Sequence, residues 1–297
     1  MTSADVGADV RAHDVAAGGT EQTAGGATRR RRAAPGNRLT AGSRIGLGVA
    51  TLWFSLLVLL PLTAVVVETS RGGWRAFWQT LTDEQTLAAI RLTLLESLLV
   101  TVINVVIGTL IAWVLVRDDF AGKRVLDVVI DVPFALPTIV AGLVLLSLYG
   151  PRSPIGVDVA NTRVAVFLAL LFVTLPFVVR TVQPVLAELD TEAEEAAASL
   201  GASRPAIFRR IILPGLLPAI AAGAAMSFAR AISEYGSLVL LSGNLPMRTE
   251  VTSVRILSYI ENGNLSAAAA VAAVLLVAAL AVIVALEVIQ RKVSRRG

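Results

Sequence analysis

The chain alternates between long apolar blocks and short polar stretches. At ~1.5 Å rise per residue, each block comes close to or exceeds the ~30 Å hydrocarbon core of a bilayer. Their length and unbroken apolarity predict helices rather than barrel strands. We therefore expect an all-α polytopic membrane protein with six transmembrane helices, at roughly Ile45–Val67, Thr86–Val116, Val132–Tyr149, Val164–Leu186, Pro214–Leu241 and Leu265–Ile289. The third block begins with Pro133 and Pro137, which predicts a kinked or irregular start.

The two ends of the chain differ from these blocks. Residues 1–42 are rich in Ala, Gly and Thr and carry the cluster Arg29–Arg32. Such a composition buries too little apolar surface to offset the entropy of ordering, so we expect a disordered tail. An arm that binds nucleic acid is the less favoured interpretation. The domain plan is a tail over 1–42, a transmembrane domain over 43–292 with a polar loop at 191–214, and a short end over 293–297.

Composition narrows the chemistry. The chain is 55% hydrophobic and 16% charged, with a mean hydropathy of +0.74. It has no cysteine, which excludes disulfides, iron–sulfur clusters and thiol catalysis. Its single histidine, His13, lies in the tail, so we expect no histidine-based metal site. No two carboxylates have the spacing or context for acid–base work, and we expect no catalytic residues.

Lysine and arginine predict the orientation. Of the 26 basic residues, 17 fall in the termini and in the loops near Arg117 and Arg204, seven fall in the other loops, and two, Arg180 and Arg230, fall within spans. Cytoplasmic loops of membrane proteins carry the excess of Lys and Arg. Both termini and the polar loop over 191–213 are therefore expected in the cytoplasm, and the pI near 10.1 follows from the same rule rather than from a nucleic-acid partner.

The polar loop has the pattern of two short helices around a glycine. Thr191 and Glu194 have capping-box spacing, and the alanines that follow favour helix. Gly201 can end the first helix, and Ser203 can cap a second one. A flat alanine surface suits docking in a groove of another protein, although a connector that packs only on its own membrane domain explains it equally well.

This loop resembles the EAA signature of bacterial ABC-importer permeases, a type I, MetI-like architecture. The order is E-A-A, three residues, G, nine residues and I-x-L-P, with the signature positions at Glu195, Ala196, Ala197, Gly201, Ile211, Leu213 and Pro214. In that family the first short helix couples the permease to an ATPase subunit. The segments "DVPFALPTIVAGLVL", "LPFVVRTVQPVLAEL", "SFARAISEYGSLVLLSGN" and "RTEVTS" further resemble the CysT-type permeases of sulfate/thiosulfate importers. The resemblance runs from Ile45 to Arg291.

Ionisable and polar groups within spans are candidates for the path of an anion, because they are costly in lipid. Arg230 and Glu234 stand four apart and can pair, either to fix helix packing or to leave Arg230 facing the path with Ser233 nearby. Arg180 either lies on the path or reaches the cytoplasmic interface. Ser227, Ser237, Gly223, Gly236 and Asn104 are explained as well by ordinary packing. Asp127 and Asp131 are expected to be solvated or bonded to the disrupted backbone of the third span.

The resemblance implies a function. The sequence lacks G-x-x-x-x-G-K-[ST], so ATP would be used by a partner, with no cofactor bound by this chain. The implied protein is a bacterial inner-membrane permease subunit that moves sulfate or thiosulfate by alternating access. Its implied partners are an ABC ATPase dimer, a CysW-type sister permease, an extracytoplasmic binding protein and membrane lipid. The alternatives are a molybdate or tungstate permease and, from another class, a proton-coupled anion transporter with Glu234 as the titrating group.

Overall fold

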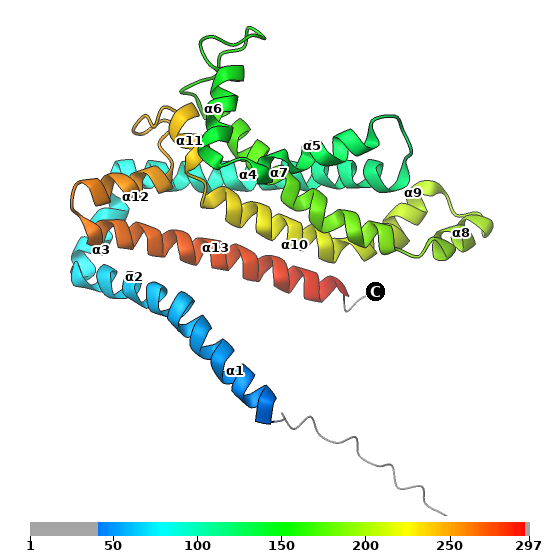
Figure 1. The fold of residues 1–297 in the computed structure, drawn as a ribbon, viewed down its shortest axis with the longest axis horizontal. Helices are drawn as coiled ribbons and strands as arrows, with labels where there is room; N and C mark the ends of the chain where they lie inside the picture. Colours follow the sequence, from blue (N-terminus) through cyan, green and yellow to red (C-terminus); the bar gives the residue numbers. More distant parts are fainter. Residues whose placement is uncertain (1–40, 295–297) are drawn as a thin grey trace, which may run out of the picture. The chain divides into compact units, whose positions relative to one another are not determined.

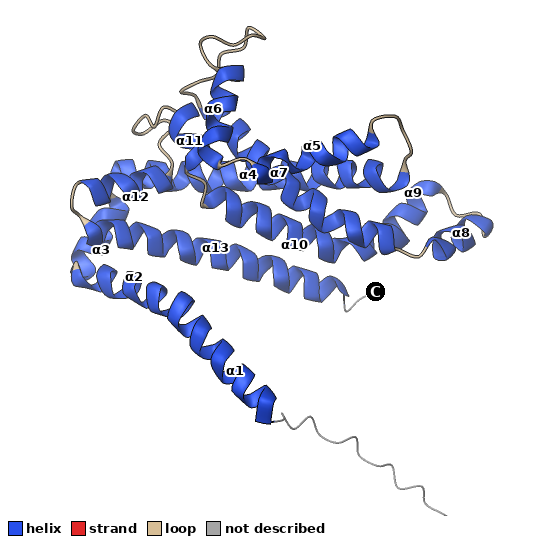
Figure 2. Ribbon diagram, in the orientation of Figure 1, coloured by secondary structure: helices blue, strands red, loops and turns tan. Residues whose placement is uncertain are grey.

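The computed structural model describes residues 41–294, and every regular element in that range is helical (Figures 1 and 2). The expected disordered tail lies almost entirely outside the described residues. The chain divides into two units, Met1–Trp53 and Phe54–Gly297. The first contributes all but the last residue of α1 (Ala41–Phe54), an apolar helix with exposed side chains.

The second unit contains the remaining elements. These are η1 (Ser55–Leu59), α2 (Leu60–Arg71), α3 (Gly73–Thr82), α4 (Glu84–Arg117), α5 (Lys123–Ala135), α6 (Thr138–Tyr149), α7 (Arg163–Glu188), α8 (Thr191–Ser199), α9 (Arg204–Ile207), η2 (Phe208–Ile212), α10 (Leu213–Ile232), α11 (Gly236–Leu241), α12 (Thr252–Glu261) and α13 (Leu265–Ser294). Among the described residues, five helices are long and apolar enough to cross a membrane, and a bent pair makes a sixth. This agrees with the six expected spans.

Two spans differ from the prediction. The third is broken: α5 and α6 meet at an angle of 116° around Leu136 and Pro137. Proline disfavours helical geometry in the residue before it, which explains a break at this point. The fifth was expected to run unbroken to Leu241, but α10 ends at Ile232 and α11 begins only at Gly236. The residues at this break, Ser233, Glu234 and Tyr235, are polar, but the apolar residues on both sides of them keep the average hydropathy of the block high.

The core of the second unit is built on α4, α7 and α10, which pack on one another and run alongside α13 (Figure 1). Close approach depends on glycine. A Cβ added to Gly108 of α4 would lie 2.9 Å from the Val178 side chain, and one added to Gly223 of α10 would lie 3.0 Å from the Val178 Cα. Small residues let membrane helices approach in this way, so the predicted packing role of Gly223 is confirmed.

A buried polar layer lies between two apolar clusters of this core. One cluster includes Leu92 and Leu170, and the other includes Val179 and Leu216. Between them, Asn104 Nδ2 donates to Thr174 Oγ1 at 2.8 Å and to Ser227 Oγ at 3.3 Å. All three side chains are fully buried. Such hydrogen bonds between membrane helices contribute roughly 1 kcal/mol each, and here they join α4, α7 and α10.

Candidate functional site

The polar loop folds as two helices around Gly201. Gly201 has φ +84°, Ala202 N donates to Ala197 O at 3.0 Å, and Gly201 N donates to Ala198 O at 2.9 Å. These are the two hydrogen bonds of a Schellman motif, which ends a helix on a left-handed residue. The loop has the predicted helix–glycine–helix form.

The predicted caps are wrong in detail. The N-cap of α8 is Asp190, whose Oδ1 accepts from Glu192 N at 2.9 Å, so the helix begins one residue earlier than the Thr191 capping box requires. Ser203 occupies the predicted N-cap position of α9 and its carbonyl accepts from Ala206 N and Ile207 N, but its side chain makes no cap hydrogen bond. Aspartate and threonine are both good caps, and their adjacency hides which one is used.

Most of the surface of the α8 helix is exposed. None of its residues is buried, and the following Leu200 is 88% exposed. The seven signature positions divide between surface and core: Glu195 and Ala196 are exposed, whereas Ala197 and Ile211 pack against the apolar cluster around Val179. Leu213 and Pro214 form the first turn of α10. The signature therefore joins an exposed helix to a span through a short connection.

One ion pair fastens α8 to the long helix α4. Arg117 Nη2 lies 2.5 Å from Glu194 Oε1, and each side chain is only about one-fifth exposed. The Arg117 guanidinium also lies 5.6 Å from the centre of the Trp113 ring, which packs edge-on against Phe208 of η2. These side chains line a groove of about 650 Å³ between α4, α8 and α9. Sequence reasoning missed Arg117, because nothing local to it indicates a partner 77 residues away.

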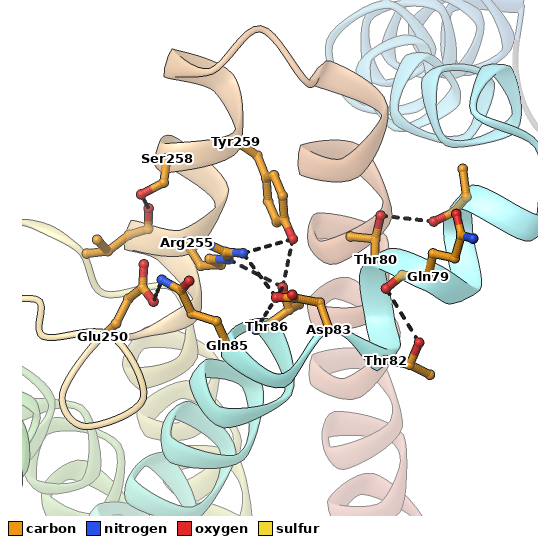
Figure 3. Close-up of polar contacts among 12 residues, drawn as sticks. Gln79, Thr80, Thr82, Asp83, Gln85, Thr86, Glu250, Arg255, Ser258 and Tyr259 are labelled. Carbon is orange, nitrogen blue, oxygen red and sulfur yellow. Dashed lines mark hydrogen bonds and ion pairs between the residues drawn. The ribbon is translucent and has the colours of Figure 1, made fainter.

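The opposite end of α4 carries a denser network (Figure 3). Asp83 caps α4 by accepting from the backbone and hydroxyl of Thr86, both at 2.9 Å, and its Oδ2 lies 3.0 Å from Arg255 Nη2. Tyr259 contacts Thr86 at 2.8 Å, and Arg255 lies 4.4 Å above its ring. Burial opposes ionisation of Asp83, but the hydrogen bonds from Thr86 and the charge of Arg255 outweigh it and lower the pKa of Asp83. The network ties α4 to α12.

The two broken spans meet at a crossing of α6 and α11. A Cβ added to Gly142 would lie 2.7 Å from the Ser237 carbonyl oxygen, and one added to Gly236 would lie 2.9 Å from the Ile139 nitrogen. Glycine at both positions is therefore required, which confirms close approach at Gly236. Non-helical backbone within membrane spans is tolerated where protein buries it or where it lines a cavity, and discontinuous helices often mark transport sites.

Arg230 and Glu234 lie at the second break. The predicted pair forms, with Arg230 Nη2 2.7 Å from Glu234 Oε2, as an ion pair without hydrogen-bond alignment. Glu234 lies beyond the end of α10 rather than on its face, is 1% exposed, and caps α11 by accepting from Ser237 N and Oγ. The Arg230 side chain is 29% exposed and makes no other polar contact within residues 41–294. Ser233 is exposed and donates to carbonyls of its own helix end.

Arg180, unlike Arg230, has a hydrogen-bond acceptor for each of its donors. The Arg180 side chain does not simply extend to the cytoplasmic interface, and Asp127 and Asp131 are not simply solvated, because the guanidinium of Arg180 binds both carboxylates. Arg180 Nε and Nη2 donate to the two carboxylate oxygens of Asp131, both at 2.7 Å, and Nη1 donates to Asp127 Oδ1 at 2.6 Å. Bonds to Gln183 Oε1 and the Asp127 carbonyl use the remaining donors. A guanidinium has five N–H donors, so none is left for an anion.

Comparison with known proteins shows which family this chain is similar to. Residues 104–296 match the family of binding-protein-dependent transport system inner membrane components. The chain is 41% identical to the sulfate transport system permease protein CysT of Salmonella typhimurium over 266 residues, covering 87% of this chain and 96% of that protein. The Escherichia coli protein of the same name is 40% identical with the same coverage. A probable sulfate transport system permease protein from Chlorokybus atmophyticus is 43% identical over 241 residues, which cover 79% of this chain and 84% of that protein.

Solved structures show the same fold at lower identity. A bacterial alginate ABC transporter complexed with its periplasmic protein matches with a TM-score of 0.68 at 18% identity, covering 84% of this chain and 94% of that one. An inward-facing methionine ABC transporter matches with a TM-score of 0.53 at 19% identity, covering 70% and 94%. The architecture is thus that of a multi-pass ABC-importer permease.

Proposed function

The chain belongs to the family of binding-protein-dependent transport system inner membrane components, and within it to the CysT-type permeases, and we propose that it is the permease subunit of an ATP-driven importer of sulfate or thiosulfate. A relative sharing 41% of residues over nearly its whole length supports the anion class. In this proposal the chain alternates between outward- and inward-facing states and has both termini in the cytoplasm. It works with an ATPase dimer, a sister permease and an extracytoplasmic binding protein.

The observation that carries the proposal is the exposure of α8. Only Glu194 and Ala197 of α8 lie against the chain's own domain, whereas no residue of α8 is buried and Glu195 and Ala196 are open, more surface than a connector that served only its own domain needs to leave free. The Schellman turn at Gly201 fixes the angle at which α8 leaves the body, and the Arg117–Glu194 pair joins it to α4. A helix held in this way fits a groove on a partner and passes the partner's movement to the spans.

The test compares substitutions in and after α8 with a control substitution at a second glycine of similar backbone conformation. Gly201→Val forces a β-branched residue into left-handed backbone, and Glu195→Arg reverses an exposed charge on α8. We expect both variants to lose sulfate uptake and to co-purify less ATPase. Gly263→Val is the matched control. Gly263 also has a positive φ, +72°, and open space for a Cβ, but it follows α12, which contacts the end of α4 away from α8. Normal uptake by both α8 variants would refute the coupling role.

For the anion path we propose Arg230 as the residue that attracts the anion. It is partly exposed beside the meeting point of two broken spans, and it keeps donors beyond its contact with Glu234. Glu234 would limit how tightly the anion is held, since transport needs release as well as binding. Arg180 fits this role less well because Asp127, Asp131 and Gln183 engage all of its donors. Because Glu234 is paired with Arg230, the arrangement supports an anion path better than a proton-coupled scheme.

A double variant separates this path from simple packing. Arg230→Gln alone would leave Glu234 buried and unpaired, which is strongly destabilising by itself. Arg230→Gln combined with Glu234→Gln removes both charges at once. If the pair only neutralises itself, the double variant transports normally. If Arg230 attracts the anion, the double variant assembles with the ATPase but takes up little sulfate.

A further inference from the structure

The short helix α3 carries an aromatic face. Trp74, Phe77, Trp78 and Leu81 follow the spacing i, i+3, i+4, i+7, which places them on one side of a helix. The aromatic rings contact one another: Trp74 stacks on Phe77 with centroids 5.6 Å apart, and Trp78 meets Trp74 edge-on at 5.5 Å. Arg75, Gln79 and Thr82 share a second, polar side of the helix.

This face is unusually open. Trp74 is 74% exposed and Trp78 is 48% exposed, and no residue of α3 is buried. The helix joins the end of α2 to the start of α4, at the end of α4 opposite Arg117 and α8 (Figure 1). In water, a cluster of exposed tryptophans would be costly to maintain. Something apolar is therefore expected to cover it.

A groove beside α3 indicates what kind of molecule covers the aromatic face. It holds about 380 Å³ and is lined by Trp74 and Phe77 together with Val66 of α2 and Ala273 of α13. Val66 is 64% exposed within a span, where the surrounding medium is lipid. The aromatic face of α3 therefore borders the same groove as Val66, a residue of a membrane span. A protein partner in the aqueous phase would instead meet the polar side that carries Arg75 and Gln79.

Charge near the groove suits a phosphate group. Arg71 ends α2, has its side chain 70% exposed, and pairs with Glu68 at 2.7 Å. Arg75 is exposed one residue beyond Trp74, and its side chain makes no hydrogen bond or ion pair within residues 41–294. Tryptophan at the headgroup level with neighbouring basic residues is the usual pattern of a membrane–water interface.

We propose that α3 lies in the membrane interface and that its groove holds an acyl chain of one phospholipid, with the lipid phosphate near Arg71 and Arg75. The leaflet is the one on the side of the membrane away from α8. The bound lipid would fix the depth at which α2 and α4 end, and through the cap at Asp83 the position of the network between α4 and α12. This inference does not depend on which anion the protein carries.

Quenching by brominated lipids tests the proposal in the full chain. One variant keeps Trp74 alone, through Trp53→Phe, Trp78→Phe and Trp113→Phe. The matched control also has Trp74→Phe and places its single tryptophan on the polar side of α3 by Gln79→Trp. In bilayers of phosphatidylcholine brominated near the glycerol end of the chain, we expect strong quenching of Trp74 and much weaker quenching in the Gln79→Trp variant. Absent quenching of Trp74, or equal quenching in both variants, would overturn the proposal.

A second readout identifies the occupant in the assembled transporter. The photoreactive residue benzoylphenylalanine is placed at position 74 by Trp74 replacement, and its adducts are identified by mass spectrometry after irradiation in membranes. A phospholipid adduct supports the proposal. An adduct with a sister permease or a binding protein would show that a protein covers the groove, and the lipid proposal would then be wrong.

Discussion

At its first turn, α4 is tied to α12 by several shared contacts among Asp83, Thr86, Arg255 and Tyr259, whereas at its last turn one ion pair, Arg117–Glu194, joins it to α8. The first region is a closed network in which the Thr86 side chain is fully buried. The second region borders an open groove of about 650 Å³ beside the exposed helix α8.

The difference concerns which parts can move. A segment with few buried contacts can shift at low cost, while a network with many shared partners moves as a unit. The α8 end is therefore suited to respond to a partner, and the other end is suited to hold helix positions. Because α4 is one continuous 34-residue helix, displacement at Arg117 is carried along its length rather than lost in a loop.

The largest expected effect comes from breaking the single ion pair. Arg117→Glu places two carboxylates where a pair 2.5 Å apart stood, and the groove gives them partial burial. We expect sulfate uptake to fall to about a tenth of normal or less, since roughly 1.4 kcal/mol of lost coupling corresponds to tenfold. Uptake of labelled sulfate by cells with comparable membrane levels of the protein is the measurement.

The control for that prediction is the exchanged pair. Combining Arg117→Glu with Glu194→Arg restores the attraction with reversed sense, and we expect most of the uptake to return. If the exchanged pair is as defective as the single variant, the Arg117 side chain acts through Trp113 or the backbone and not through Glu194.

A smaller effect, on stability rather than coupling, is expected at the other end. Arg255→Ala removes donors to Asp83, Thr86 and Tyr259 and the contact with the Tyr259 ring. We expect a loss of about 2 kcal/mol in the free energy of unfolding, with ATPase co-purification retained. Arg255→Lys keeps the charge without the planar fork and should lose less. Reduced ATPase binding by Arg255→Ala would mean that the two ends are not separate in function.

The smallest effect is a pH dependence at Asp83. Its pKa in the folded protein is lowered from 3.8, so the stabilisation is fully present above about pH 4 and is lost as the pH falls through the lowered value. Asp83→Asn keeps the cap to Thr86 but not the ion pair. Because Asp83 is 42% exposed and screened, we expect a loss of only about 0.5 kcal/mol at pH 7.

Thermal unfolding of the purified protein measures this difference. The melting temperatures of the wild type and Asp83→Asn should differ slightly at pH 7 and converge toward pH 3. A constant difference across that range would show that Asp83 contributes through shape and not through charge.

Much of the fold follows from the sequence, because membrane spans are long and locally determined. Six apolar blocks predicted the spans, and Pro133 and Pro137 predicted an irregular third one. The break at residues 233–235 was not predicted, because no proline marks it and the polar residues Ser233 and Glu234 were assigned to the interior of the span. The structure shows that Gly236 must meet α6, and this requirement is set by a partner distant in sequence.

The candidate site was predictable where the pattern is local. The turn at Gly201 was recognised from residue spacing, and the Arg230–Glu234 pair from a separation of four residues. Contacts over long separations were not visible: Arg117 with Glu194, and Arg180 with Asp127 and Asp131. A charged residue in sequence does not reveal whether its partner lies elsewhere in the chain, in another subunit or in the substrate.

The coupling of α8 to a separate ATPase is most directly tested by cross-linking at Leu200. The sequence contains no cysteine, so Leu200→Cys provides a single thiol at a position 88% exposed. Ile155→Cys, 55% exposed in the loop after α6, serves as the control at the other end. With a short thiol–amine cross-linker in membranes containing the assembled transporter, the proposal predicts an adduct between the ATPase and Leu200→Cys but none with Ile155→Cys. Sulfate uptake without any ATPase adduct at Leu200→Cys, or with equal adducts at both positions, would contradict it.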